Sequence, residues 1–404
     1  MKISIIQPSR NNLKYLKWSY DAIRKNQGSH EVEICVADDF SDKDGTWNWC
    51  LEMMEKDPLF KAIRNEGPTR LGHTILYDRL INEVASFDIC MIYHADMYLC
   101  PSALNAIEKH IGPKKIVSLT RIEPPLHPPG PEKILLDCGI EPEQFDEDKL
   151  LHHLEMEYDI LHEGKTTEGI FAPWAFMKSD FQEIGGHDPL YAPQSKEDSD
   201  IFNRFQLNGV QFIQTWEGYV YHMTCRGSRF NPDLTTPGKN SPEWEAQNLR
   251  STRNFIRKWG HFCKHDSLMK PIVPSKYGIA LRVENCNQML LEVLEPWCSR
   301  IYSDAEWMKY VTLEQPNTKF DLRIRCHSLT QTDRYDYDDI IVEIDGNRFT
   351  QQDFAYIQQL SEVLDASDLL NEFKQPGEQF ELGNLKITIM NVQTYEKDLI
   401  VCKK

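Results

Sequence analysis

Short apolar runs and longer stretches of helical periodicity alternate through the first half of the chain. Ile3 to Ile6, Val32 to Ala37 and Ile89 to Tyr93 are apolar-rich runs of strand length. Between the last two runs, residues 75–84 carry Ile, Leu and Val at the 3.6-residue period of a helix. Strands that alternate with helices predict an α/β domain built on a mostly parallel sheet.

An acidic residue follows the third apolar run at the point where the predicted strand ends. The run at residues 89–93 leads into His94-Ala95-Asp96. Because the carboxyl ends of strands form the ligand crevice of an open α/β sheet, Asp96 would stand where a phosphate-bound cation can be held. The alternative is that Asp96 only caps the turn before Pro101.

The second apolar run ends in the same way, in an acidic pair. Asp38 and Asp39 follow Val32 to Ala37, and a polar turn separates them from the next helical pattern. Two carboxylates at a strand end can accept hydrogen bonds from a ribose or from a nucleobase. They could equally cap the helix that follows, and the residues by themselves leave both functions open.

Taken together and in order, these stretches resemble the nucleotide-sugar half of family 2 glycosyltransferases with the GT-A fold. The matching segments are ISIIQP at the first strand, VADDFSDKDGT at the second, and the HAD triplet before a Pro. The resemblance implies that Asp38 and Asp39 contact the nucleoside, that Pro8 and Ala95 line the nucleotide-sugar site, and that Asp96 binds a divalent cation on the diphosphate.

One departure from the family pattern concerns the metal. The family's triplet is usually D-x-D, and its first acid is His94 here. Imidazole is a poor ligand for Mg²⁺ and an acceptable one for Mn²⁺, so we expect a divalent cation with Mn²⁺ preferred and Mg²⁺ still feasible. Whether His94 itself is a ligand stays open at this point.

A loop between the second and third strands carries one arginine. Arg70 precedes the predicted helix at residues 75–84, in a segment that resembles the family's N-x-G-x-x-x-A-R-N-x-G motif with several replacements. A guanidinium can hold a diphosphate through two parallel hydrogen bonds, which makes Arg70 a candidate donor-binding residue. A solvated arginine is the alternative.

The stretch from Gly185 to Gly209 resembles the acceptor half of the same family. Its pattern is G-G-x-D, then E-D-x-D, then R-x-x-x-x-G. In the family one acid of the E-D pair is the catalytic base, which here implies Asp198 or Glu197. The alternative is that both acids merely favour the positive end of a helix.

A histidine after the acceptor half completes the candidate set. His222 ends the run Tyr219 to Tyr221, where many enzymes of this fold supply an additional metal ligand. The resemblance therefore implies that His222 and Asp96 share one cation. The Gly-, Pro- and Asn-rich stretch from Arg226 to Pro242 corresponds to a mobile loop over the diphosphate in such enzymes.

Two domains are expected from these patterns. Residues 1–265 would form the GT-A domain, with a nucleotide-sugar half at 1–120 and an acceptor half at 121–265. Residues 266–280 would be a linker, and residues 281–404 a smaller α+β domain to which the sequence assigns no chemistry. Predicted elements there include a helix at 287–301 and a strand at 319–325.

Composition limits the partners. The formal charge of −17, from 45 basic and 62 acidic residues, argues against general binding to nucleic acid. The eleven cysteines form no CxxC pair, Cys35 and Cys90 lie inside apolar runs, and no apolar run reaches transmembrane length. We expect a soluble, cytoplasmic protein in a reducing compartment, with peripheral membrane association left open.

The sequence thus predicts an inverting, metal-dependent glycosyltransferase that moves a sugar from a nucleotide diphospho-sugar to an acceptor hydroxyl. One alternative is a sugar-nucleotide or glycan binding protein whose catalysis has decayed, for which His94 is the best argument. Another is a nucleotidyltransferase, although that chemistry favours a basic Gly-rich loop where this chain has PSRNN. The sugar, the base and the acceptor do not follow from the sequence.

Overall fold

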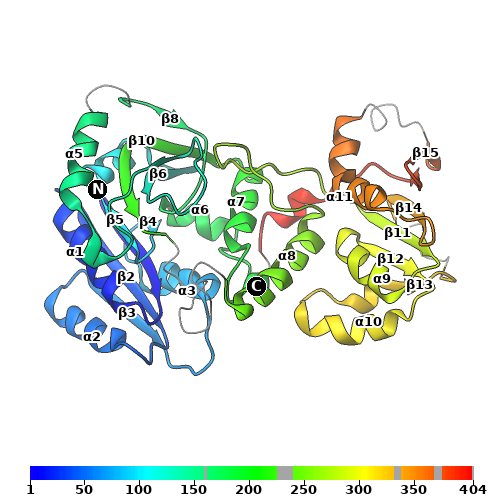
Figure 1. Cartoon of the computed structure of the whole chain (residues 1–404), viewed down its shortest axis with the longest axis horizontal. Helices are drawn as coiled ribbons and strands as arrows, with labels where there is room; N and C mark the ends of the chain where they lie inside the picture. The colour runs from blue at the N-terminus through cyan, green and yellow to red at the C-terminus, as the bar shows by residue number, and fades with distance from the viewer. Residues whose placement is uncertain (159–161, 225–239, 332–337, 368–374, 403–404) are drawn as a thin grey trace. The chain divides into compact units, whose positions relative to one another are not determined.

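The protein is described by a computed structural model that covers residues 1–158, 162–224, 240–331, 338–367 and 375–402 (Figure 1). The chain forms two compact units, which are described separately. The first unit contains Met1–Glu245, His265–Ile272 and Val401–Lys404, and the second contains Ala246–Lys264 and Val273–Ile400. Residues 246–264 therefore belong with the second unit, and residues 265–272 with the first.

The first unit is built on a ten-stranded mixed sheet with helices around it (Figure 1). Its central path runs β3-β2-β1-β4-β9-β6-β10-β5, with β7 beside β6 and β8 beside β10. The strands are β1 (Lys2–Ser9), β2 (Glu31–Asp39), β3 (Phe60–Asn65), β4 (Ile89–Ile92), β5 (Met97–Leu99), β6 (Lys115–Glu123), β7 (Lys133–Leu135), β8 (Thr166–Thr167), β9 (Trp174–Met177) and β10 (Gln211–His222).

Helices connect many of these strands. They are α1 (Leu13–Asn26), α2 (Thr46–Lys56), α3 (His73–Arg79), α4 (Ala103–His110), α5 (Glu147–Tyr158), α6 (Lys178–Glu183), α7 (Glu197–Leu207) and the start of α8 (Pro242–Trp259). A π-helical turn, η1 (Leu80–Val84), continues α3, and 3₁₀ turns lie at η2 (Pro142–Gln144) and η3 (Pro189–Tyr191).

Four parallel strands position the candidate site. β1 pairs in parallel with both β2 and β4, and β2 pairs in parallel with β3. The central residues of β1 and β2 are almost all buried, because helices cover the sheet, and this explains their continuous apolar runs. The carboxyl ends of β1, β2 and β4 therefore lie at one edge of the sheet, as the sequence predicted.

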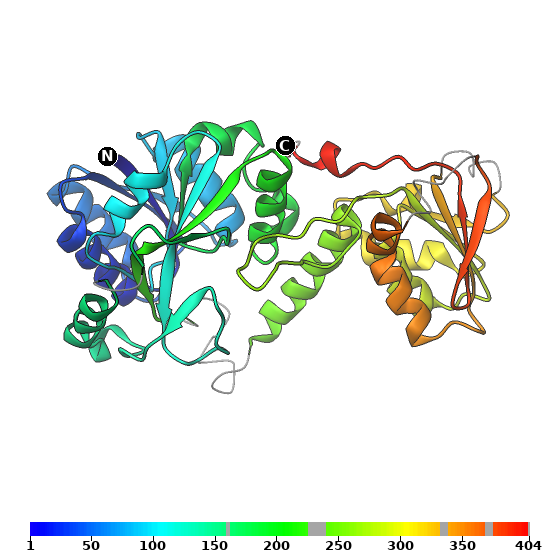
Figure 2. The same ribbon diagram turned by 90° about the horizontal axis from the view of Figure 1, so that it is seen from above.

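The second unit contains a smaller, six-stranded sheet in the order β13-β12-β11-β14-β16-β15 (Figure 2). β11 (Ile279–Glu284), β12 (Arg300–Ser303), β13 (Cys326–Ser328) and β14 (Ile340–Asp345) are parallel, and the hairpin β15 (Glu378–Leu382) and β16 (Leu385–Ile389) is antiparallel. The helices are α9 (Gln288–Leu294), α10 (Trp307–Glu314) and α11 (Gln351–Ala366), with 3₁₀ turns η4 (Glu295–Trp297), η5 (Gln315–Asn317), η6 (Leu322–Ile324) and η8 (Glu396–Leu399).

The core of the second unit lies mainly on one face of its sheet. Buried and partly exposed residues alternate along β14, which is the pattern of a strand with one covered face. Residues of α9, α10 and α11 all contribute to the same apolar cluster as the strands. The unit is therefore a mixed sheet with its helices packed against one side.

The predicted fold class is confirmed, while several element predictions need correction. The predicted strand at 319–325 is wrong, because residues 322–324 form the 3₁₀ turn η6. The predicted helix at 287–301 ends at residue 294, and β12 begins at residue 300. Sequence analysis missed β3 and β5, since both are short and their apolar residues lack a clear period.

Two statements on composition find a counterpart in the structure. Cys35 and Cys90 are buried free thiols, as their apolar surroundings predicted. Among the residues that the structure describes, none of the helices combines the length and the apolar character needed to cross a membrane.

A buried ion pair fixes α7 against the turn that precedes it. Nε of Arg204 lies 2.8 Å from a carboxylate oxygen of Asp200, and both side chains are fully buried. The other two guanidinium nitrogens donate to the carbonyls of Ile184, at 2.9 Å, and Gly186, at 2.7 Å. Arg204 and Asp200, two of the motif residues found by sequence analysis, are thus structural.

We predict that Arg204→Met destabilises the first unit by about 3–5 kcal/mol, because it leaves the Asp200 carboxylate buried without its counter-charge. The measurement is urea unfolding of the whole chain. Lys114→Met is the control, since the Lys114–Glu183 pair is exposed and should contribute less than about 1 kcal/mol. Equal effects of the two substitutions would contradict this assignment.

Candidate active site

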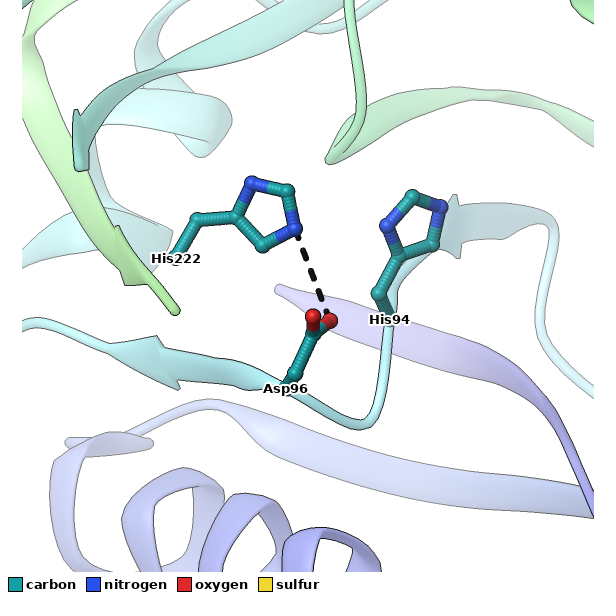
Figure 3. A group of neighbouring side chains, drawn as sticks. All are labelled: His94, Asp96 and His222. Carbon is teal, nitrogen blue, oxygen red and sulfur yellow. Dashed lines mark ion pairs between the residues drawn. The ribbon is translucent and has the colours of Figure 1, made fainter. Parts of the chain in front are cut away.

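Three potential metal ligands meet at the carboxyl edge of the first sheet (Figure 3). His94, Asp96 and His222 each offer a ligand atom, and these atoms all lie within 4.8 Å of one another. Nε2 of His222 is 3.5 Å from Oδ1 of Asp96, and the rings of His94 and His222 have centroids 5.7 Å apart. Asp96 and His222 are buried, and His94 is partly exposed.

The sheet topology explains how residues so distant in sequence come together. β4 lies in the middle of the sheet, whereas β5, only a few residues later, pairs antiparallel with the end of β10. In that register Met97 lies opposite His222, and the backbone N–H of Met223 donates to the carbonyl of Asp96 at 3.0 Å. The pairing of β5 with β10 therefore places Asp96 beside His222, the last residue of β10.

The charges of this group depend on one another. Burial lowers the pKa of His94 to about 4, so its imidazole is neutral and can act as a ligand at neutral pH. Burial also acts to lower the pKa of His222, but the Asp96 and Glu123 carboxylates outweigh it and raise that pKa to about 9. The two carboxylates therefore favour a positive charge at this position. A metal cation could supply that charge in place of the second proton of His222.

The donor set fits a transition-metal cation better than Mg²⁺ or Ca²⁺. It combines two imidazole nitrogens with one carboxylate, and a metal about 2.0–2.2 Å from each ligand could be reached from atoms this close. Imidazole nitrogens suit zinc and iron best, and Mn²⁺, which also takes carboxylate oxygens, binds such a mixed set less tightly. The residues present thus fit the divalent cation that the sequence predicted.

Glu123, at the end of β6, is a part of the site that sequence analysis missed. Its buried carboxylate lies 3.0 Å from Nδ1 of His222. It also accepts from Arg121 at 2.8 Å and from Lys133 at 3.0 Å. The available signal was an acid that directly follows an apolar strand, the same signal that identified Asp96.

The acidic pair at the end of β2 is buried and bound by the protein. Asp38 is fully buried, accepts from the backbone N–H of Ser41 at 3.1 Å, and lies 3.2 Å from Nε of Arg64. Neither acid caps α2: that helix begins after Gly45, and the nearest carboxylate to its first turn is Asp44, which accepts from the N–H of Thr46 at 3.2 Å. The helix-capping alternative is thereby excluded.

Asp39 organises the loop that carries Arg70. Its carboxylate accepts from the side chain of Asn65 at 2.7 Å and from the backbone N–H groups of Leu71 and Gly72 at 2.9 Å each. Nε of Arg70 lies 3.6 Å from the same carboxylate. Asp39 therefore fixes the backbone of residues 65–72 at the edge of the sheet.

Arg70 connects the loop at residues 65–72 with the loop that precedes α7. Its guanidinium donates to the side chain of Gln194 at 2.7 Å, and Arg70 is about one-fifth exposed. The loop of Arg70 touches the loop that contains Pro193 at Gly72. An added Cβ at Gly72 would lie 2.0 Å from the carbonyl oxygen of Pro193, and φ of Gly72 is +77°. Only glycine fits this approach without displacing one of the loops.

Glu197 and Asp198 begin α7 after a sharply turned loop. Ser195 and Lys196 both have left-handed backbone conformations, with φ of +80° and +73°. Glu197 is buried, and its Oε2 has no hydrogen-bond partner among the described residues, while Asp198 is partly exposed. Burial raises the pKa of both carboxyls, and the Asp198 charge raises that of Glu197 further.

Two further residues link the acidic pair to the metal group. The charges of Asp198, Glu197 and Asp96 all act on Tyr77, whose pKa is raised mainly by burial. His73, at the start of α3, is held neutral by burial and by the positive charge of Arg70, which lower its pKa to about 3. Sequence analysis named neither residue, because both sit within an ordinary helical pattern.

The remaining predicted residues are placed as follows. Pro8 lies in β1 opposite Ala37, at the carboxyl end of the strand. Ala95 is buried between the two ligands His94 and Asp96. The predicted loop from Arg226 to Pro242 lies mostly outside the described residues, as residues 225–239 are not among them.

Several solved structures are similar to this chain. Structural likeness covers 64% of this chain and 48% of GalNAc-T7 with UDP, GalNAc and Mn²⁺, at 14% identity and a TM-score of 0.45. It covers 63% of this chain and 63% of the mannosyltransferase PcManGT from Pyrobaculum calidifontis with GDP-Man and Mn²⁺, at 16% identity and a TM-score of 0.40. It covers 64% of this chain and 64% of S. aureus TarS 1–349, at 15% identity and a TM-score of 0.40.

The chain spans less than two thirds of the length of each of these three proteins. No curated protein matches it in sequence. Residues 4–124 match the family Glycosyl transferase family 2. The match covers the strands that supply Asp38, Asp39, His94 and Asp96, and it confirms the resemblance described above. The matched residues lie in the first unit, and over them the chain is similar to glycosyl transferase family 2.

Proposed function

We propose that this protein is an inverting, metal-dependent glycosyltransferase that transfers a sugar from a nucleotide diphospho-sugar to an acceptor hydroxyl. The observation that carries the proposal is the convergence of His94, Asp96 and His222 at the edge of a family 2 domain. The nearby acids Glu197 and Asp198 supply the second requirement, a base with a raised pKa.

The donor would be held by the carboxyl edge of the sheet. His94, Asp96 and His222 would hold a divalent cation, which supplies positive charge to stabilise the leaving diphosphate. Arg70 would add a guanidinium to the same leaving group, and Asp39 fixes the loop that presents Arg70. Asp38, Pro8 and Ala95 are proposed to border the nucleoside and the donor sugar.

The acceptor would be activated from the other side of the site. Asp198 is the better candidate for the base, because its carboxylate is partly exposed and can reach a bound hydroxyl. Glu197 is buried beside it, and burial together with the charge of Asp198 raises the pKa of Glu197 to about 8. Attack opposite to the leaving diphosphate would invert the anomeric centre.

The arrangement of His94 bears on the alternative of a decayed binding protein. His94 was the best sequence argument for lost catalysis, since it replaces the first acid of the family triplet. Its ring lies close enough to Asp96 and His222 to share one ion with them, so the replacement is compatible with a working metal site. A panel of sugar nucleotides assayed for hydrolysis and transfer with Mn²⁺ distinguishes an enzyme from a binder.

We expect chelator to abolish activity and Mn²⁺ to restore it better than Ca²⁺. The reason is that Ca²⁺ prefers oxygen ligands, whereas this group offers two imidazoles. The measurement is sugar-nucleotide turnover after chelation and re-addition of each metal. Full activity in excess chelator would remove the metal from the proposal.

We expect Asp198→Asn to lower kcat by about 10²–10⁴-fold and to leave the Kd for the donor nucleotide almost unchanged. The amide keeps the shape of the carboxylate and loses its basicity. Glu197→Gln is the matched variant, because it alters the adjacent acid by the same single group. Loss of turnover only in Glu197→Gln would move the role of base to Glu197, and normal turnover in both would place the base outside this motif.

We also expect an acid limb in kcat/KM that lies above the range of ordinary carboxyls, whose pKa values are about 3.9–4.3. A base acts as the carboxylate, so activity rises with pH through the pKa of the base. Burial raises the pKa of Asp198 and of Glu197, and the limb moves up with it. A pH profile at saturating Mn²⁺ provides the measurement, and a limb centred near pH 4 would contradict the assignment.

A further inference from the structure

The carboxylate of Glu123 lies directly behind one of the candidate metal ligands. Its Oε1 is 3.0 Å from Nδ1 of His222, while Nε2 of the same ring faces Asp96 at 3.5 Å. An ionised carboxylate can only accept a hydrogen bond, so Nδ1 of His222 must be the donor. When a cation replaces the second proton of the ring, the lone pair that binds the cation is therefore that of Nε2, on the side of Asp96.

Two buried cations keep this carboxylate ionised and in place. Arg121 donates to Oε1 of Glu123 at 2.8 Å, and Lys133 lies 3.0 Å from Oε2. The side chains of Arg121 and Lys133 are each only 7% exposed, and that of Glu123 is 2% exposed. A buried acid with three donors around it is both charged and fixed in orientation.

We propose that Glu123 is a positioning residue for the metal site, which fixes the ring of His222 so that Nε2 binds the cation. The inference rests on the proposed function, because it needs a cation at His94, Asp96 and His222. Carboxylates that orient a ligating histidine in this way raise its basicity and set its tautomer. Glu123 does not touch the substrate, and its effect passes through His222.

A purely structural function is the competing explanation. Glu123 ends β6 and pairs with Lys133, which begins β7, so it could serve only to join these two strands. Glu132 offers a matched control, because its carboxylate lies 3.5 Å from Arg121 and makes no recorded contact with His222 among the described residues. Removing the charge of Glu123 or of Glu132 takes a partner from Arg121. Only the removal at Glu123 also takes a partner from His222.

The test is Mn²⁺ affinity, measured by electron paramagnetic resonance on the full chain without substrate. We expect Glu123→Gln to weaken Mn²⁺ binding by about 10–100-fold, as loss of such a partner does in other metal sites. Glu132→Gln should bind like the wild type. Equal affinities of the two variants would overturn the positioning role, whereas a wild-type chain that binds no Mn²⁺ would remove the metal site itself.

A second measurement distinguishes orientation of the His222 ring from a general loss of negative charge. It uses wild-type protein, so it does not depend on whether a variant folds. In wild-type protein labelled with ¹⁵N-histidine and loaded with Zn²⁺ as a diamagnetic probe, nuclear magnetic resonance reports which nitrogen carries the proton. We expect His222 to be protonated at Nδ1 and metal-bound at Nε2. Metal on Nδ1, or a ring without a protected Nδ1–H, would overturn the inference.

Discussion

The pairing of β5 with the end of β10 is the constraint on which the candidate site depends. After the central strand β4, the chain crosses the edge of the sheet and returns antiparallel to a strand more than one hundred residues later in the sequence. The crossing segment is His94-Ala95-Asp96, and the next residue, Met97, pairs with His222. A shift of one residue in this register would turn the side chain of His222 to the other face of the sheet.

Some acids of the first unit hold the fold, and others are those that we propose for binding and catalysis. Asp39, Asp44 and Asp200 accept hydrogen bonds from backbone or side-chain donors of the protein and thereby fix loops and helix ends. Asp96, Glu197 and Asp198 lie where burial and neighbouring charges shift their pKa values. Perturbed carboxyls that gather at one edge of a sheet are typical of functional sites.

Charge compensation explains how so many ionisable groups are tolerated in a buried site. Glu123 is surrounded by Arg121, Lys133 and His222, which together hold its pKa well below the usual range although burial acts to raise it. The same principle governs the second unit, where fully buried Glu295 pairs with Arg257 at 2.7 Å and Arg325 at 2.7 Å. Glu123 and Glu295 remain charged in the interior because each has cationic partners at hydrogen-bond distance.

The sequence by itself determined the class of the first unit and most of its candidate residues. Alternating strands and helices follow from local periodicity, and an acid directly after a buried strand locates Asp38 and Asp96 because strand ends form the ligand crevice. The tertiary structure decided which residues share a site. Strand pairing brings His222 to Asp96, Glu123 lies behind that histidine, and Asp39 binds a loop more than thirty residues away. Such contacts join segments far apart in the chain, and neither spacing nor periodicity along the sequence encodes them.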